Sequence, residues 1–172
     1  MFRLLNKKKK DNKGFSLVEL VIAIAIMAIL VGILAPQYTK YVEKSRKAAD
    51  ASNMDEMVKV VKVYAADPAN ELAVGTYTIT ITTDDGTKFS PDPIPQGLKA
   101  ELDASIPKWN ATTTKSKKWG VSGNPTNITA MVNVNSEGGT SVTYTTGDAE
   151  GTEAKNNKFA QYMSSGEAKA KK

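Results

Sequence analysis

Glu19 is the residue whose position most suggests a specific chemistry, because it is the single ionisable side chain in an apolar run from Phe15 to Ala35. A carboxylate at the centre of a membrane costs roughly 2.5–3.5 kcal/mol on insertion scales. In a helix that begins at Phe15, Glu19 lies only about 6 Å from the start. It is therefore either a carboxylate tolerated near the membrane interface or a buried charge that awaits a cation.

A second set of candidate ligands lies near the C-terminus. Asp148, Glu150 and Glu153 are closely spaced beside glycines, and oxygen ligands of this kind bind calcium. Their spacing does not fit an EF-hand loop, so an ordinary solvated acidic loop is the alternative. The chain has no cysteine and no histidine, which excludes disulfides, His-dependent nucleophiles and His-ligated metals. We expect no enzyme active site and no cofactor.

Three further patterns have ordinary explanations. Asn110-Ala111-Thr112 and Asn127-Ile128-Thr129 match the N-glycosylation pattern, which often occurs by chance. Trp109 and Trp119 flank lysines at 115, 117 and 118, and basic residues near aromatic ones can bind nucleic acid strands. We expect one or both tryptophans to lie in the core, with the lysines on a solvated loop.

The basic charge of the chain belongs to its first 14 residues. The net charge is +5, and residues 1–14 account for all of it with six Lys or Arg and one Asp. The remaining chain has 17 basic and 17 acidic residues. Without residues 1–14 the chain is neutral, which argues against general nucleic-acid binding and allows packing against copies of itself.

The apolar run is long enough to cross a membrane. Its 21 residues extend about 31 Å as a helix, against a hydrocarbon core of about 30 Å. A secretory signal peptide has a shorter apolar region and a small-residue cleavage site after it, and an uncleaved signal anchor is the other alternative. Six Lys or Arg precede the run and four follow it closely, which places the leader in the cytoplasm.

The helical periodicity continues beyond Pro36. Proline lacks an N–H and crowds the carbonyl four residues back, here that of Gly32. This pair predicts either a helix stop at the membrane exit or a bend in one long helix. Apolar residues then recur at helical spacing up to Asp67-Pro68, where the helix should end. One cluster of this stripe follows Pro36 and the other lies further along the helix, and we expect the stripe to pack beneath a sheet: Tyr38, Tyr41 and Val42, then Met54, Met57, Val58, Val61 and Ala65.

The chain beyond residue 66 is rich in Thr, Asn, Gly and Pro and alternates between apolar and polar residues. This pattern predicts strands at 77–81, 128–134 and 142–144, a hairpin turn at 137–139, and short helices at 98–105 and 159–163. The fold class is therefore α+β. A long N-terminal helix, first membrane-spanning and then amphipathic, packs against an antiparallel β-sheet head.

The segment from Lys7 to Pro36, KKKKDNKGFSLVELVIAIAIMAILVGILAP, resembles the class III signal peptide and first helix of type IV pilins and type II secretion pseudopilins. The resemblance implies cleavage by a prepilin peptidase between Gly14 and Phe15, with N-methylation of Phe15. It implies that Glu19 neutralises the N-terminal amine of a neighbouring subunit. It also implies that the helix near Gly32 and Pro36 bends and is partly melted in the assembled filament.

The resemblance divides the chain into a cleaved leader (1–14), the transmembrane and filament-core half of the first helix (15–36), its amphipathic half (37–66) and a β-rich head (67–172). The implied function is the major structural subunit of a type IV pilus for adhesion, aggregation and twitching or gliding motility. A pseudopilin of a type II secretion or DNA-uptake machine is the alternative, although the large head favours a pilus. An anchored binding domain that never polymerises is a third possibility.

The partners implied by the resemblance are further copies of this chain, the prepilin peptidase, the pilus assembly ATPase with its inner-membrane platform, and a surface receptor. The chain would lie in the cytoplasmic membrane as a prepilin and then in an extracellular pilus. Many Gram-negative pilins close a C-terminal disulfide, from which this chain departs. Its Lys-, Asn- and Thr-rich composition resembles that of Gram-positive, clostridial-like bacteria.

Overall fold

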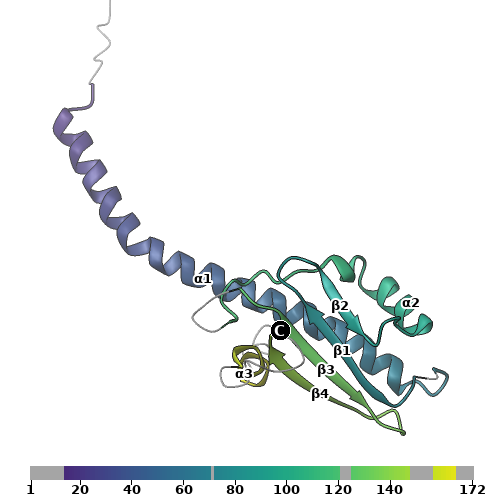
Figure 1. The fold of residues 1–172 in the computed structure, drawn as a ribbon. Helices are drawn as coiled ribbons and strands as arrows, with labels where there is room; N and C mark the ends of the chain where they lie inside the picture. Colours follow the sequence, from purple (N-terminus) through teal and green to yellow (C-terminus); the bar gives the residue numbers. More distant parts are fainter. Residues whose placement is uncertain (1–13, 71, 121–124, 148–156, 166–172) are drawn as a thin grey trace, which may run out of the picture. The chain divides into compact units, whose positions relative to one another are not determined.

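The computed structural model describes residues 14–70, 72–120, 125–147 and 157–165. The helices are α1 (Leu17–Ala66), α2 (Gln96–Ser105), η1, a short 3-10 turn (Trp109–Ala111), and α3 (Lys158–Ser164). The strands are β1 (Gly75–Ile81), β2 (Thr87–Ser90), β3 (Ile128–Val134) and β4 (Thr140–Thr146). The chain divides between Lys40 and Tyr41 into two compact units, and Figure 1 shows its elements.

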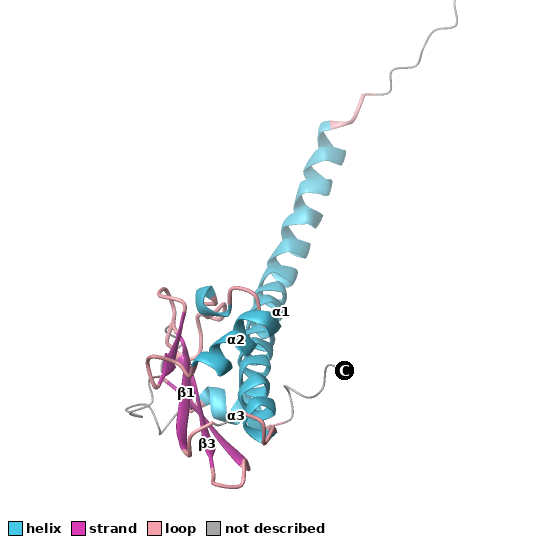
Figure 2. Cartoon of the chain, turned by 90° about the vertical axis from the view of Figure 1, so that its right-hand side faces the viewer, coloured by secondary structure: helices cyan, strands magenta, loops and turns pink. Residues whose placement is uncertain are grey.

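The second unit is built on a four-stranded antiparallel sheet in the order β2-β1-β3-β4. Tyr77 of β1 lies opposite Val132 of β3, and Val132 lies opposite Val142 of β4. Apolar residues therefore form rows on one face of the sheet, because side chains alternate along each strand. The C-terminal half of α1 and the shorter helices cover this face (Figure 2).

The core confirms the second cluster of the predicted stripe on α1, in which each residue is buried: Met54, Met57, Val58, Val61 and Ala65. They share one hydrophobic cluster with the inward-facing residues of β1 and β3 and with Leu98 and Leu102 of α2. The first cluster does not join this core, since Tyr38 and Tyr41 are exposed at 69 % and 72 %. Trp109 and Trp119 also lie in this core, at 5 % and 0 % exposure, so neither presents a ring for stacking on a nucleic acid base.

Sequence patterns located most elements. Of the two alternatives at Pro36, a helix stop is wrong, since α1 continues through that residue to Ala66 as the periodicity predicted. The stop at Asp67-Pro68 is confirmed, and the Asp67 Oδ1 accepts a hydrogen bond from the Ala69 N–H at 2.9 Å in the turn that follows. Strand β2 was not predicted, because its four residues lie between a turn and a proline-rich stretch.

Candidate processing and assembly site

The Gly14–Phe15 peptide bond lies just before α1, outside regular secondary structure. Phe15 is 89 % exposed. A Cβ atom built on Gly14 would have no other atom within 4 Å. The backbone on both sides of this bond is therefore open to a peptidase, and the missing side chain of Gly14 allows a close approach.

Ser16 and Glu19 form the N-terminal cap of α1. The Oγ of Ser16 accepts a hydrogen bond from the Val18 N–H at 3.3 Å, and the Glu19 Oε2 accepts one from the Ser16 N–H at 2.9 Å. The Leu20 N–H donates to the Ser16 carbonyl at 3.1 Å, which makes Ser16 the N-cap residue. This reciprocal pattern is a capping box, which satisfies two backbone donors that the first helical turn leaves without partners.

The capping box gives Glu19 a structural role that the sequence prediction missed. The Ser-x-x-Glu spacing ahead of an apolar run is the signal that would have revealed it. The cap uses one carboxylate oxygen, Oε2. The carboxylate has a second oxygen that can accept a hydrogen bond from a cation. Helix capping and pairing with an amine are therefore compatible.

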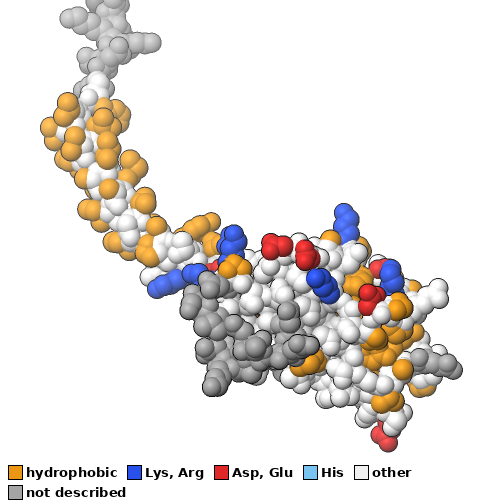
Figure 3. All heavy atoms as spheres, viewed as in Figure 1, with side chains coloured by type: hydrophobic (Ala, Val, Ile, Leu, Met, Phe, Trp, Pro, Cys, Tyr) orange, Lys and Arg blue, Asp and Glu red, His pale blue; other side chains and the backbone are white. Residues whose placement is uncertain are grey.

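The helix of the first unit buries none of its apolar surface within the chain. Every residue from 14 to 41 is exposed, and Figure 3 shows hydrophobic side chains along this part of α1. In the described residues one helix is long and apolar enough to cross a membrane. An apolar surface of this extent requires lipid or protein around it, because monomeric soluble proteins rarely expose one.

Gly32 and Pro36 both lie within α1, without contacts from other elements. A Cβ built on Gly32 would meet nothing within 4 Å. Pro36 cannot donate to the Gly32 carbonyl, so one intrahelical hydrogen bond is missing in the turn between them. The Thr39 Oγ1 donates to the Pro36 carbonyl at 3.0 Å. The residues expected to loosen the helix therefore occupy a weakened turn of an otherwise continuous helix.

The head contains a buried carboxylate, Asp50, which is 1 % exposed. Its Oδ1 accepts the Lys115 N–H at 2.7 Å, and its Oδ2 accepts the Ser116 N–H and the Trp119 Nε1–H, both at 2.9 Å. Burial raises the pKa of Asp50, while these three donors act in the opposite direction. No local sequence signal marks this residue, since its partners lie 65 to 69 positions away.

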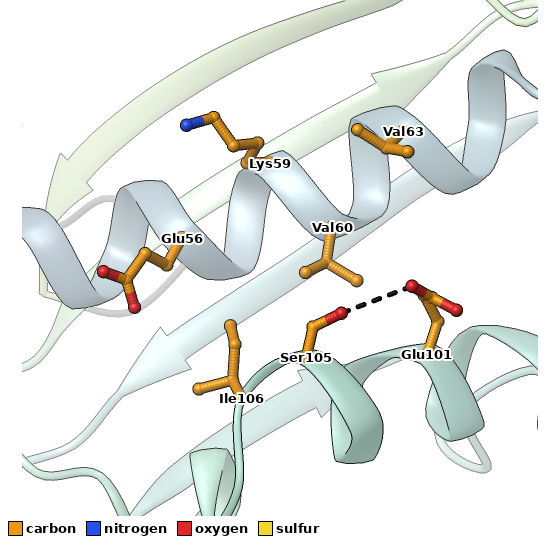
Figure 4. A pocket seen from close by; sticks show the side chains of 7 residues that line it. All are labelled: Glu56, Lys59, Val60, Val63, Glu101, Ser105 and Ile106. Carbon is orange, nitrogen blue, oxygen red and sulfur yellow. Dashed lines mark hydrogen bonds between the residues drawn. The ribbon is translucent and has the colours of Figure 1, made fainter.

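A groove of about 320 Å³ lies between α1 and α2 in the second unit. Figure 4 shows Val60 on α1 pointing toward Ser105 and Ile106, with a hydrogen bond of 3.3 Å from the Ser105 Oγ to the Glu101 Oε1 on the other side. Val63 lies one turn further along α1. Glu56 and Lys59 complete the lining of the groove. Glu101 and Ser105 are both exposed, so water competes for this hydrogen bond.

The remaining candidates from the sequence have different outcomes. Asp148, Glu150 and Glu153, the calcium candidates, lie outside the described residues. Within the described part of the chain, no group of three or more acidic side chains could hold a metal ion. Asn110 is exposed on η1. The Asn127 Oδ1 accepts the Thr83 N–H at 3.2 Å, which gives that side chain a structural role in the head.

Comparison with known proteins gives one match. Residues 9–35 match the family described as the prokaryotic N-terminal methylation motif. No curated protein and no solved structure matches the chain. The motif implies processing by a prepilin peptidase and polymerisation into filaments, and together with the fold it indicates a structural protein. The motif at residues 9–35 and the α+β architecture support the identification of this chain as a type IV pilin-like prepilin.

Proposed function

We propose that this chain is the major structural subunit of a type IV pilus. The peptidase would cleave between Gly14 and Phe15 and methylate the new α-amine of Phe15. The subunit would then wait in the membrane through residues 15–36, with residues 37–66 and the head of residues 67–172 outside. The assembly ATPase and platform would move it into a surface filament for adhesion, aggregation and twitching or gliding motility.

The observation that carries this proposal is the arrangement around Glu19. The methylation motif covers the residue, and the carboxylate caps the helix through one of its two oxygens. Cleavage after Gly14 would give every subunit a positively charged α-amine at Phe15, close in the sequence to Glu19. A carboxylate and an amine that meet in an apolar filament core stabilise each other, because neither would otherwise have a partner in a medium of low dielectric constant.

Two substitutions separate charge pairing from helix capping. Glu19→Gln retains an oxygen that can complete the capping box but removes the charge, whereas Glu19→Ala removes both. We expect both variants to insert and to be processed, and neither to assemble. The measurement is the amount of pilin in filaments sheared from cells, against the cleaved pilin in membranes.

A conservative variant provides the control. Glu19→Asp keeps the charge on a shorter side chain and should assemble better than Glu19→Gln. If the Gln variant assembled as well as the wild type, capping would explain Glu19 and the charge-pairing proposal would be wrong. A processed wild-type chain that never leaves the membrane fraction would instead favour a pseudopilin.

A further inference from the structure

Basic residues gather where the second unit begins. Three follow the apolar run on α1, and three more lie on the loop that precedes Trp119. We call these six residues the basic patch: Lys44, Arg46, Lys47, Lys115, Lys117 and Lys118. Basic side chains lie on α1 just beyond the hydrophobic residues in Figure 3. Of the six, all but Lys47 are exposed.

Specific contacts hold the loop that precedes Trp119 against α1, and so join the two segments of the patch. The buried Asp50 accepts the N–H groups of Lys115 and Ser116 at 2.7 and 2.9 Å, and Glu43 accepts a hydrogen bond from the Ser116 Oγ. The Lys47 Nζ lies 4.8 Å from the centre of the Trp119 ring, within cation–π range. The lysines of the loop are therefore held beside those of the helix, although about 70 residues separate them in the sequence.

The patch concentrates positive charge in a chain that is otherwise balanced. Two carboxylates lie beside the patch. The Glu43 Oε2 lies 3.9 Å from the Arg46 Nη1, with the Glu43 side chain 14 % exposed, and Asp50 is 1 % exposed. The six residues of the basic patch, counted together with Glu43 and Asp50, have a net charge of +4. Since residues 15–172 are neutral in sum, the rest of that chain has a net charge of −4. Six of the 17 Lys and Arg residues beyond residue 14 belong to this patch, and the other eleven lie elsewhere in the sequence.

We propose that the basic patch binds the anionic phosphate headgroups of the membrane in which α1 waits before assembly. Lys44 lies nine residues beyond Ala35 in α1, about 13 Å along the helix. Headgroups extend about 5–8 Å beyond the hydrocarbon core on each side, and a lysine side chain reaches several ångströms towards them. The Lys44 side chain can therefore reach to within about one Debye length of the lipid phosphates, and the contacts that join the loop to α1 keep Lys115, Lys117 and Lys118 beside this segment of the helix.

The positive charge of the basic patch supports anionic lipid headgroups as its partner. Lys and Arg on the exported flank oppose the charge bias that orients a membrane helix, so insertion does not explain them. An anionic surface attracts nearby Lys and Arg side chains, and the attraction weakens with salt. Contact through the patch would hold the head on the membrane surface until extraction. The inference rests on the membrane stage of the proposed function and does not require a filament.

The test is residue-by-residue amine labelling of the full chain in vesicles, read by mass spectrometry. One set of vesicles is phosphatidylcholine and the other also contains phosphatidylglycerol. Flotation with the vesicles first establishes insertion. We expect labelling of Lys117 and Lys118 to slow by about threefold or more in anionic vesicles at low salt. Lys88, on β2, should label equally in both, and high salt should remove the difference.

Variants that remove the same number of charges inside and outside the patch test whether the slower labelling depends on the patch. Replacing Lys115, Lys117 and Lys118 by Gln should abolish the slower labelling of Lys44, whereas replacing three lysines outside the patch should preserve it: Lys59, Lys62 and Lys88.

Equal labelling in both vesicles would overturn the patch proposal while leaving the pilus proposal intact. Failure to insert would overturn both. Protection by duplex DNA in neutral vesicles, without protection by anionic lipid, would assign the patch to nucleic acid and reject a lipid partner.

Discussion

At the scale of single residues, Asp50 connects the helix to the loop that carries the basic patch. One carboxylate accepts three N–H donors from Lys115, Ser116 and Trp119. The three donors favour the ionised carboxylate, whereas burial opposes its charge and has the larger effect on the pKa of Asp50. The residue is isolated from solvent, so a lost acceptor would not be replaced readily by water.

We expect Asp50→Asn to destabilise the head by about 2–4 kcal/mol, because an amide NH₂ would face N–H donors that then stay unsatisfied. The measurement is thermal unfolding of the full chain in detergent micelles, followed by near-ultraviolet circular dichroism of the tryptophans. Asp55→Asn is the matched control, since Asp55 is exposed on the same helix, and it should change little. Equal effects of the two substitutions would contradict the role given to Asp50.

The pH dependence of stability gives a second test of the same residue. Burial raises the pKa of Asp50 above its ordinary value of 3.8, despite the opposing hydrogen bonds. The folded chain then binds this proton more tightly than the unfolded chain, so stability from Asp50 is fully present below about pH 3.8 and falls as pH rises through the raised pKa. The stability difference between wild type and Asp50→Asn should therefore shrink with rising pH. A difference that widens instead would show that the donors outweigh burial.

At the scale of elements, the sequence predicted the helices and strands whose apolar residues recur at regular spacing. The second cluster of the α1 stripe and the strands β1, β3 and β4 repeat at helical or alternating spacing, and the structure confirms them. Strand β2 lacks such a signal, because four residues are stabilised mainly by pairing with β1, as in Ile79 opposite Phe89. The Asp50 contacts depend on chain segments that only the folded structure brings together, whereas the Ser16–Glu19 cap had a recognisable local pattern.

The turn between β1 and β2 requires glycine at position 86. Gly86 has φ +78°, and a Cβ built there would lie 2.1 Å from the Asn110 carbonyl oxygen. We expect Gly86→Ala to lower the free energy of unfolding by about 2 kcal/mol or more, from backbone strain and from displacement of η1. Urea unfolding of the full chain in micelles measures it. Asp85→Ala, at an exposed neighbour, should shift the midpoint little, and a similar shift in both would contradict the close approach.

At the scale of the whole molecule, the two units face different environments. The first exposes an apolar helix throughout, and the second has its own core of helix and sheet. Removal of a leader that contains the entire net charge would leave a neutral subunit. Neutral subunits with apolar helices can associate closely with little repulsion, which suits a polymer in which these helices share the interior.

The central claim is that the chain is cleaved after Gly14 and polymerises. The most direct test is intact mass spectrometry of filaments sheared from the cell surface, with electron microscopy of the same fraction. We predict long filaments in which this chain dominates and begins at an N-methylated Phe15. Filaments in which the chain still contains residues 1–14, or membranes in which no chain begins at Phe15, would contradict the account.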